Sequence, residues 1–159
     1  MKEIVVDFEK IGHNGVGIGK YNNKVVFAYG VLPGEKVKIK VLKEKKNFIK
    51  GEVAEVLEKS KFRVNETESH YLSCSPWQVF DYNYQVELKK NILKEIFLQF
   101  AHTEIEIENF YISPKIFGYR TKIEYSFLKE NNEYFFAFYK RESYKEKVKL
   151  DNGCKLISN

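Results

Sequence analysis

The N-terminal part of the chain is a series of short apolar runs separated by turn-forming residues. Ile4–Val6, Val25–Ala28 and Val53–Leu57 are runs of strand length, and Val37–Val41 alternates apolar with basic side chains. Pro33–Gly34 supplies a turn between two of these runs. Several short strands with turn signals between them are typical of a small β-barrel, closed or nearly closed.

The hydrophobic period changes to that of a helix between Asp81 and Ala101. Apolar residues recur there at every fourth position, with two more beside them, so they share one face of an amphipathic helix. These residues are Tyr84, Leu88, Ile92, Leu93, Ile96, Phe97 and Phe100. Asp81 is the expected N-cap. Residues 59–76 show little periodicity, and we expect an irregular linker there.

Alternation with period two returns near the C-terminal end. Lys122–Phe127 alternates strictly, Glu130–Glu133 has the composition of a hairpin turn, and Tyr134–Tyr139 reads as the return strand. Lys147–Leu150 is a candidate third strand. A helix followed by an antiparallel meander indicates a second, small α+β unit.

These patterns predict a mainly β fold with two domains. We expect a barrel over residues 1–58. Residues 59–159 are expected to hold the linker, the helix at about 81–101 and antiparallel strands over about 118–157.

Composition adds a mild preference for an anionic partner. The 159 residues include 27 Lys and Arg against 22 Asp and Glu, a formal net charge of +5, which favours nucleic acid or an acidic surface. The first residues are too polar for a signal peptide, and no apolar run has the length of a membrane span. Two cysteines are too few for a disulfide scaffold. We therefore expect a cytoplasmic protein with no membrane partner.

A glycine-rich run, Gly12–Gly19, invites comparison with nucleotide-binding loops. Such loops need a strand before them and a helix after them, or a Gly-Lys-Ser/Thr ending. Here Lys20 is followed by Tyr21, and no helical pattern follows. We interpret the glycines as bends and bulges in a tightly curled barrel.

The first candidate RNA-binding segment is a basic stretch with one aromatic residue. Lys43, Lys45, Lys46 and Lys50 can offset phosphate charge, and the ring of Phe48 can stack on a base. The same composition fits equally well a solvated hairpin tip with Phe48 turned into the core.

A second candidate RNA-binding group surrounds the C-terminal hairpin. Arg120 and Lys122 begin the expected strand and share one face of it, and Lys140 and Arg141 follow the return strand. Four cations here could grip a phosphate backbone. The alternative is charge that protects an edge strand from aggregation.

The sequence shows no catalytic constellation. Cys74 and Cys154 do not form a Cys-x-x-Cys motif, and no histidine stands directly beside either thiol. His70 is the nearest histidine to Cys74, but we find no pairing of histidine with cysteine or carboxylate at ligand spacing. We assign no catalytic residue.

The barrel segment carries an ordered set of family-like matches. They are Gly15–Gly19, Lys24–Tyr29, Val31–Val37, Phe48, Lys50 and Ser60–Val64. In this order they resemble a TRAM domain, and the apolar-Pro-Gly-Glu-x-Val segment is the most specific match. The resemblance implies an OB-like five-stranded barrel that binds RNA, and it adds Arg63 to the candidate RNA-binding residues. TRAM domains occur in RNA uracil-5-methyltransferases, in methylthiotransferases and as single proteins.

The remaining segments select among these families. They are Trp77–Gln78, Tyr84–Gln85, Leu88–Lys89, Gly118–Phe127, Phe138–Arg141 and Gly153–Leu156. They resemble the central domain of the RNA uracil-5-methyltransferases, with Thr121 in place of the usual Asn. The resemblance implies that the full-length parent uses S-adenosylmethionine, bound in a Rossmann-like catalytic domain that would follow this part and serve as its intramolecular partner. In that family a cysteine thiolate adds to C6 of a flipped-out uracil, and neither cysteine here matches its motif.

The resemblance also raises the question of an iron–sulfur cluster. Many members hold one through four cysteines, of which Cys154 matches the fourth. The other three fall in the segment that corresponds to His70–Gln78, which keeps only Cys74. Two thiolates cannot fill four positions, which argues against a cluster and leaves both cysteines as candidate remnants of that metal site.

We therefore expect the RNA-binding part of an S-adenosylmethionine-dependent RNA uracil-C5-methyltransferase, with no cofactor in the chain itself and with rRNA favoured over tRNA. One alternative is a free-standing TRAM-type RNA-binding or RNA-chaperone protein with no enzymatic role. A third hypothesis is a protein-interaction module without RNA function.

Overall fold

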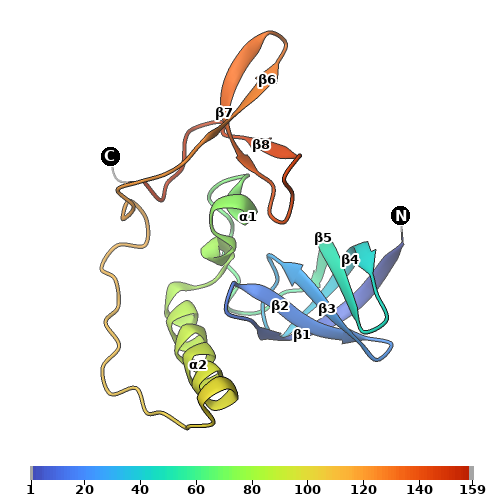
Figure 1. The fold of residues 1–159 in the computed structure, drawn as a ribbon, viewed down its shortest axis with the longest axis vertical. Coiled ribbons are helices and arrows are strands. Elements are labelled where there is room, and N and C mark those ends of the chain that lie inside the picture. The colour runs from blue at the N-terminus through green and yellow to red at the C-terminus, as the bar shows by residue number, and fades with distance from the viewer. Residues whose placement is uncertain (1, 158–159) are drawn as a thin grey trace. The chain divides into compact units, whose positions relative to one another are not determined.

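The computed structural model describes residues 2–157. The chain forms two compact units (Figure 1). The first comprises Met1–Val64 and Val79–Phe110, and the second comprises Asn65–Gln78 and Tyr111–Asn159.

A closed five-stranded barrel makes up most of the first unit. Its strands are β1 (Glu3–Ile11), β2 (Val16–Tyr21), β3 (Lys24–Tyr29), β4 (Glu35–Glu44) and β5 (Phe48–Glu58). They close in the order β1-β2-β3-β5-β4, and only the β3–β5 pair is parallel (Figure 1). The predicted fold class, mainly β with a five-stranded barrel, is confirmed.

Strand alternation fills the barrel interior. Most inward positions of the strands are buried apolar side chains, as period-two geometry favours. They are Ile4, Val6, Phe8, Val26, Ala28, Val37, Ile39 and Ile49, joined by Val31 from the loop after β3.

Two of the glycines in the Gly12–Gly19 run are required by the closeness of the barrel walls. A Cβ on Gly17 would collide with the side chain of Val31, and one on Gly19 would lie 2.6 Å from the carbonyl oxygen of Asp7. The interpretation of this run as barrel geometry agrees with these contacts.

The predicted helix is α2 (Tyr82–Ala101), and Asp81 caps it by accepting a hydrogen bond from the Tyr84 amide at 3.0 Å. Of its residues, only Gln85 and Val86 are buried. The C-terminal half of its apolar face is exposed, because nothing within residues 2–157 covers it. The exposed side chains are Leu93, Ile96, Phe97, Leu98 and Phe100.

Among the described residues, no helix has both the length and the apolar character needed to cross a membrane.

The second unit holds a short helical segment and a small antiparallel sheet. α1 (Tyr71–Cys74) lies within the linker expected over residues 59–76, and a 3-10 turn, η1 (Pro76–Val79), begins at the last residue of that linker. The sheet has the order β6-β7-β8, with β6 at Ser126–Glu130, β7 at Glu133–Tyr139 and β8 at Lys147–Lys149. The β6–β7 turn is made by two residues with positive φ, Asn131 and Asn132, as a tight hairpin requires.

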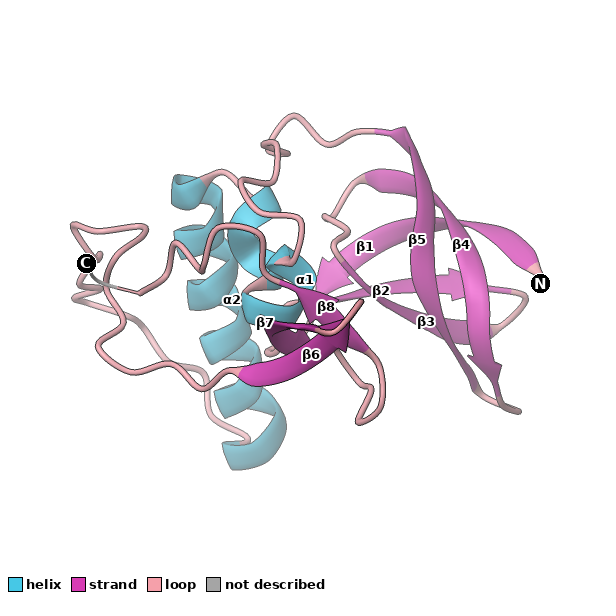
Figure 2. Cartoon of the chain, turned by 90° about the horizontal axis from the view of Figure 1, so that it is seen from above, coloured by secondary structure: helices cyan, strands magenta, loops and turns pink. Residues whose placement is uncertain are grey.

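The strand expected over Lys122–Phe127 was wrong over its first four residues. Regular pairing begins only at Ser126, and the loop from α2 to β6 has no other regular element (Figure 2). Arg120 makes one isolated parallel bridge with Ile157. Alternation persists through Lys122–Tyr125, but no neighbouring strand pairs with this stretch, so it stays irregular.

Candidate RNA interface and candidate metal centre

The basic stretch of the barrel is the hairpin between β4 and β5. Its turn is residues 45–47, and the Lys45 amide donates a hydrogen bond to the Phe48 carbonyl at 2.8 Å. Phe48 is half-buried and packs edge-on against Phe27, with ring centroids 6.3 Å apart. Part of this ring is therefore covered by the barrel wall, and the rest faces outward beside the lysines.

Several lysines on the barrel surface are paired with carboxylates. Lys36 lies 2.6 Å from Glu58, and Lys38 lies 3.0 Å from Glu55. Hydrogen bonds to these glutamates raise the pKa of both lysines. Lys2 and Lys24 both bind Glu44, and the hydrogen bond from Lys24 is the main cause of the lowered pKa of that carboxyl group.

The hairpin lysines differ from these paired lysines. Lys43, Lys45 and Lys46 are exposed, and within residues 2–157 none of them forms an ion pair. Lys50 lies near the start of β5 and is half-buried. The structure thus gathers all four predicted lysines and Phe48 on one hairpin, and the charges of Lys43, Lys45 and Lys46 are not offset by ion pairs with described carboxylates.

Arg63 occupies an interior position instead. Its Nε lies 2.6 Å from Glu35 Oε1 and its Nη2 lies 2.8 Å from Glu35 Oε2, a two-point pair. Nη2 also donates to the Gly30 carbonyl at 2.6 Å. The Glu35 side chain is fully buried and also accepts the Leu32 and Ser60 amides at 2.9 and 3.2 Å. The pair fixes the Pro-Gly-Glu turn to the chain after β5, so Arg63 has a structural task in addition to its predicted RNA contact.

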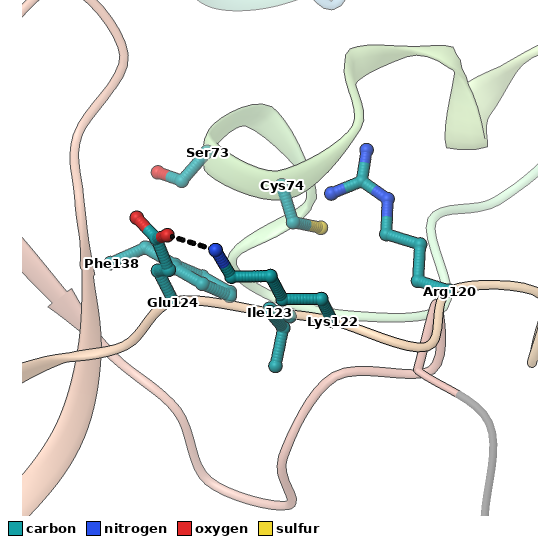
Figure 3. Close-up of a pocket in the computed structure, with 7 residues that line it drawn as sticks. All are labelled: Ser73, Cys74, Arg120, Lys122, Ile123, Glu124 and Phe138. Carbon is teal, nitrogen blue, oxygen red and sulfur yellow. Dashed lines mark ion pairs between the residues drawn. The ribbon is translucent and has the colours of Figure 1, made fainter.

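In the second unit, Arg120 and Lys122 line an open hollow of about 320 Å³ together with Cys74 and Phe138 (Figure 3). Lys122 lies 2.9 Å from Glu124, and both side chains are exposed. The guanidinium of Arg120 and the thiol of Cys74 lie on the same side of the hollow in Figure 3.

The other two predicted cations have contacts of different kinds. Lys140 pairs with Glu146 at 2.9 Å and lowers the pKa of that carboxyl group. Arg141 Nε donates to the Leu72 carbonyl of α1 at 2.7 Å, which fastens α1 to the end of β7. The structure therefore brings only Arg120 and Lys122 together in one hollow.

A cluster of metal-ligand side chains lies beside this hollow. One donor atom each from Glu68, His70, Cys74 and Cys154 lies within 4.8 Å of the others. The expectation that no histidine pairs with cysteine or carboxylate was wrong. The short sequence spacing of Glu68, His70 and Cys74 could have indicated three of the four ligands. Cys154 lies near them only because of the fold.

The cluster has two buried and two half-buried members, and it holds several acidic groups. His70 and Cys154 are 4% and 5% exposed. Burial raises the pKa of the Cys74 thiol to about 12, and the neighbouring Cys154 and Glu68 raise it further in the same direction. Neither cysteine is in a disulfide. A thiolate here is therefore unfavourable unless a cation accompanies it.

Surrounding hydrogen bonds hold the donors in place. Gln78 Nε2 donates to Glu68 Oε2 at 2.6 Å and contacts Cys74 Sγ at 3.3 Å. Thr67 Oγ1 binds the other end of the Gln78 amide at 3.1 Å, and the Lys155 amide donates to Glu68 Oε1 at 2.6 Å. These contacts orient Glu68 and Cys74 in the way that outer hydrogen bonds orient metal ligands.

The donors do not fit the iron–sulfur cluster that the family resemblance implies. Such clusters are held by four cysteine thiolates in the common case, and only two donors here are thiolates. The other two are an imidazole and a carboxylate.

Comparison with known proteins gives matches along most of the chain. A family model described as the TRAM domain matches residues 2–54. An uncharacterized RNA methyltransferase of Caldanaerobacter subterraneus is 31% identical over 126 residues, 78% of this chain and 28% of that protein. A 23S rRNA (uracil(1939)-C(5))-methyltransferase of Vibrio campbellii is 31% identical over 142 residues, 87% of this chain and 32% of that protein.

The fold also matches a solved structure. The crystal structure of Pyrococcus abyssi tRNA (uracil-54, C5)-methyltransferase, in complex with S-adenosyl-L-homocysteine, aligns with a TM-score of 0.58 at 20% identity. The alignment covers 96% of this chain and 33% of that one. The chain thus spans about a third of the length of the proteins it matches.

Proposed function

Because the chain belongs to the family of RNA (uracil-C5)-methyltransferases, we propose that it is the RNA-holding part of such an enzyme. The complete enzyme would methylate C5 of a uridine in the cytoplasm with S-adenosylmethionine as methyl donor, with rRNA favoured over tRNA. Residues 1–58 would form the RNA-binding domain and residues 59–159 would belong to the central domain. We assign no catalytic residue and no S-adenosylmethionine contact to residues 1–159.

The observation that carries this proposal is the contrast among the barrel lysines. Lys43, Lys45 and Lys46 project from the β4–β5 hairpin without an ion pair among the described residues. RNA phosphates are the natural partners of such a group, because neutralising them releases bound counterions. Phe48 lies on the same hairpin and offers the outward part of its ring for base stacking.

A second feature supports an intramolecular partner. The apolar side chains on the last two turns of α2 are exposed, among them Phe97 at 41% and Phe100 at 75%. An exposed apolar face of this kind marks an interaction surface. We propose that the catalytic domain of the complete enzyme covers it.

The test replaces Lys43, Lys45 and Lys46 together by Ala in the full 159-residue chain. Binding of a fluorescein-labelled RNA stem-loop with a uridine in its loop is followed by anisotropy. We expect the affinity to fall at least about tenfold, because phosphate contacts are lost whatever the RNA sequence.

The matched control replaces Lys2, Lys36 and Lys38 by Ala, which removes the same charge from lysines that the barrel's own carboxylates engage. An equal loss of affinity in both variants would reject the hairpin as the binding site and leave only a general charge effect. Retained binding in the hairpin variant would favour the alternative in which this surface is a solvated tip.

The free-standing RNA-binding alternative differs in what the chain does alone. Under that alternative, residues 1–159 remodel a structured RNA by themselves, which a strand-annealing assay measures. Under our proposal they bind the stem-loop without changing its pairing.

A further inference from the structure

The four side chains Glu68, His70, Cys74 and Cys154 supply the donor types that zinc prefers. Zinc binds cysteine sulfur, histidine nitrogen and carboxylate oxygen, and structural sites use four such ligands in a tetrahedron. The donors come from three places in the second unit: the segment before α1, α1 itself and the loop after β8.

The spacing of the donors fits one ion. All four donor atoms lie within 4.8 Å of one another. Bond lengths of about 2.0–2.3 Å to a central zinc place tetrahedral ligands at mutual distances of roughly 3–4 Å, so small side-chain adjustments complete the geometry.

A separate observation points into the same space. His70 is 4% exposed, and its Nε2 makes no hydrogen bond with any described residue. Nε2 does lie 3.3 Å from Glu68 Oε1, without the geometry of a hydrogen bond. A buried polar atom without a partner costs stability, so its presence calls for an unseen partner. Nε2 belongs to the donor set, and a metal ion would satisfy it.

We propose that Glu68, His70, Cys74 and Cys154 bind a single structural Zn²⁺ ion in place of an iron–sulfur cluster. On binding, each thiol gives up its proton to solvent and the thiolates ligate the ion. All four positions are filled by protein, which leaves none open for substrate or water, so the ion has a structural role.

The ion would connect parts of the second unit that lie far apart in the sequence. The apolar core there consists of four buried residues: Ala137, Leu150, Cys154 and Leu156. Cys154 would therefore connect this core to the metal ion, and Cys74 would connect α1 to the same ion. The proposal does not depend on RNA binding and would stand if the proposed function failed.

The first test measures metal content. The full chain is purified under reducing conditions, and zinc, iron and acid-labile sulfide are quantified per chain. We expect one zinc per chain without sulfide. Iron with stoichiometric sulfide would overturn the proposal, and so would a metal-free protein that binds no added Zn²⁺ or whose two cysteines have joined in a disulfide.

Cobalt provides a spectroscopic test on the wild-type chain. Co²⁺ replaces zinc at such sites, and a tetrahedral site with two thiolates gives intense visible bands and a sulfur-to-cobalt charge-transfer band. We expect both, with displacement of Co²⁺ by Zn²⁺. Weak bands typical of octahedral Co²⁺ would contradict the proposed ligand set.

Substitutions then test the individual ligands. Cys154→Ser and His70→Asn should lose the bound ion, whereas the matched controls Glu66→Gln and His13→Asn, at exposed positions outside the cluster, should keep it. Gln78→Ala keeps every ligand but removes the hydrogen bonds to Glu68 and Cys74. We expect it to weaken Zn²⁺ binding by about 10–100-fold. Unchanged binding in Cys154→Ser or His70→Asn would reject the site.

Discussion

The two units of the chain contrast in what fills their interiors. The barrel closes on nine buried apolar residues, with Ile39, Ile49 and Val26 fully inaccessible to solvent. The second unit has four buried residues in its apolar core and sets the polar cluster of Glu68 and His70 beside them. Apolar burial, worth about 1.5–3 kcal/mol for each large side chain, accounts for the barrel. The second unit depends on oriented polar contacts and, as we propose, on a metal ion.

The contrast extends to the surface charges. On the barrel, glutamates pair with Lys2, Lys24, Lys36 and Lys38. Within residues 2–157 no ion pair is formed by Lys43, Lys45 or Lys46 of the β4–β5 hairpin. In the second unit, Lys122 and Lys140 both have carboxylate neighbours. The difference identifies the hairpin as a place where clustered positive charge is left for a partner.

The largest effect is expected from breaking the buried ion pair between Arg63 and Glu35, which holds the Pro-Gly-Glu turn. Arg63→Ala leaves Glu35 buried without its partner, which should lower the free energy of unfolding by about 3–5 kcal/mol. Urea denaturation followed by circular dichroism measures it, with Lys59→Ala, at an exposed position nearby, as control. A loss no greater than that of the control would mean that Arg63 is available for RNA instead.

The next effect separates the interiors of the two units. Ile39→Ala should cost the barrel about 2–5 kcal/mol, because a closed wall cannot collapse onto the cavity. The same change should leave the zinc content of the second unit as in the wild type. If Ile39→Ala lowered both the stability of the barrel, measured by denaturation, and the zinc content, measured by metal analysis, the two interiors would not be independent.

These results bear on how much of the molecule could be predicted from sequence. Short apolar and alternating runs identified four of the five barrel strands, because most inward positions of a small closed barrel are apolar. The second strand, β2, lies in the glycine-rich run, where the pattern does not show it. The hairpin at Asn131–Asn132 was predictable because two successive residues with positive φ favour asparagine. In contrast, Lys122–Tyr125 alternates but has no pairing strand, and pattern alone does not reveal a missing neighbour.

The candidate sites were predictable to different degrees. The hairpin lysines are adjacent in sequence, so composition located them. Arg63 and Glu35 form a pair across a fold that sequence does not show, and the buried state of that pair depends on the closed barrel. Cys154 joins His70 and Cys74 only through the packing of the second unit, so the ligand set became visible only in three dimensions.

A smaller effect tests the start of α2. Asp81→Ala removes the side-chain acceptor for the Tyr84 amide, and we expect a loss of about 0.5–2 kcal/mol. Asp81→Asn retains a cap and serves as the control. If both variants unfold at the wild-type urea concentration, then packing of Val86 and its neighbours, and not the cap, fixes the start of the helix.

The smallest effect concerns the paired lysines on the barrel surface. Lys36→Ala removes an exposed ion pair with Glu58, which contributes little to stability because solvent screens the two charges. We therefore expect nearly unchanged denaturation and nearly unchanged RNA affinity. A clear loss of RNA affinity would extend the binding surface along β4 and weaken the contrast between paired and unpaired lysines.

The salt dependence of RNA binding tests the central claim, that the hairpin lysines neutralise RNA phosphates, most directly. The logarithm of the binding constant for the labelled stem-loop is plotted against the logarithm of the salt concentration, for the wild-type chain and for the variant with Lys43, Lys45 and Lys46 replaced by Ala. The loss of three phosphate contacts should make the slope shallower by about 2. Parallel lines for the two proteins would contradict the claim, because the three lysines would then release no counterions.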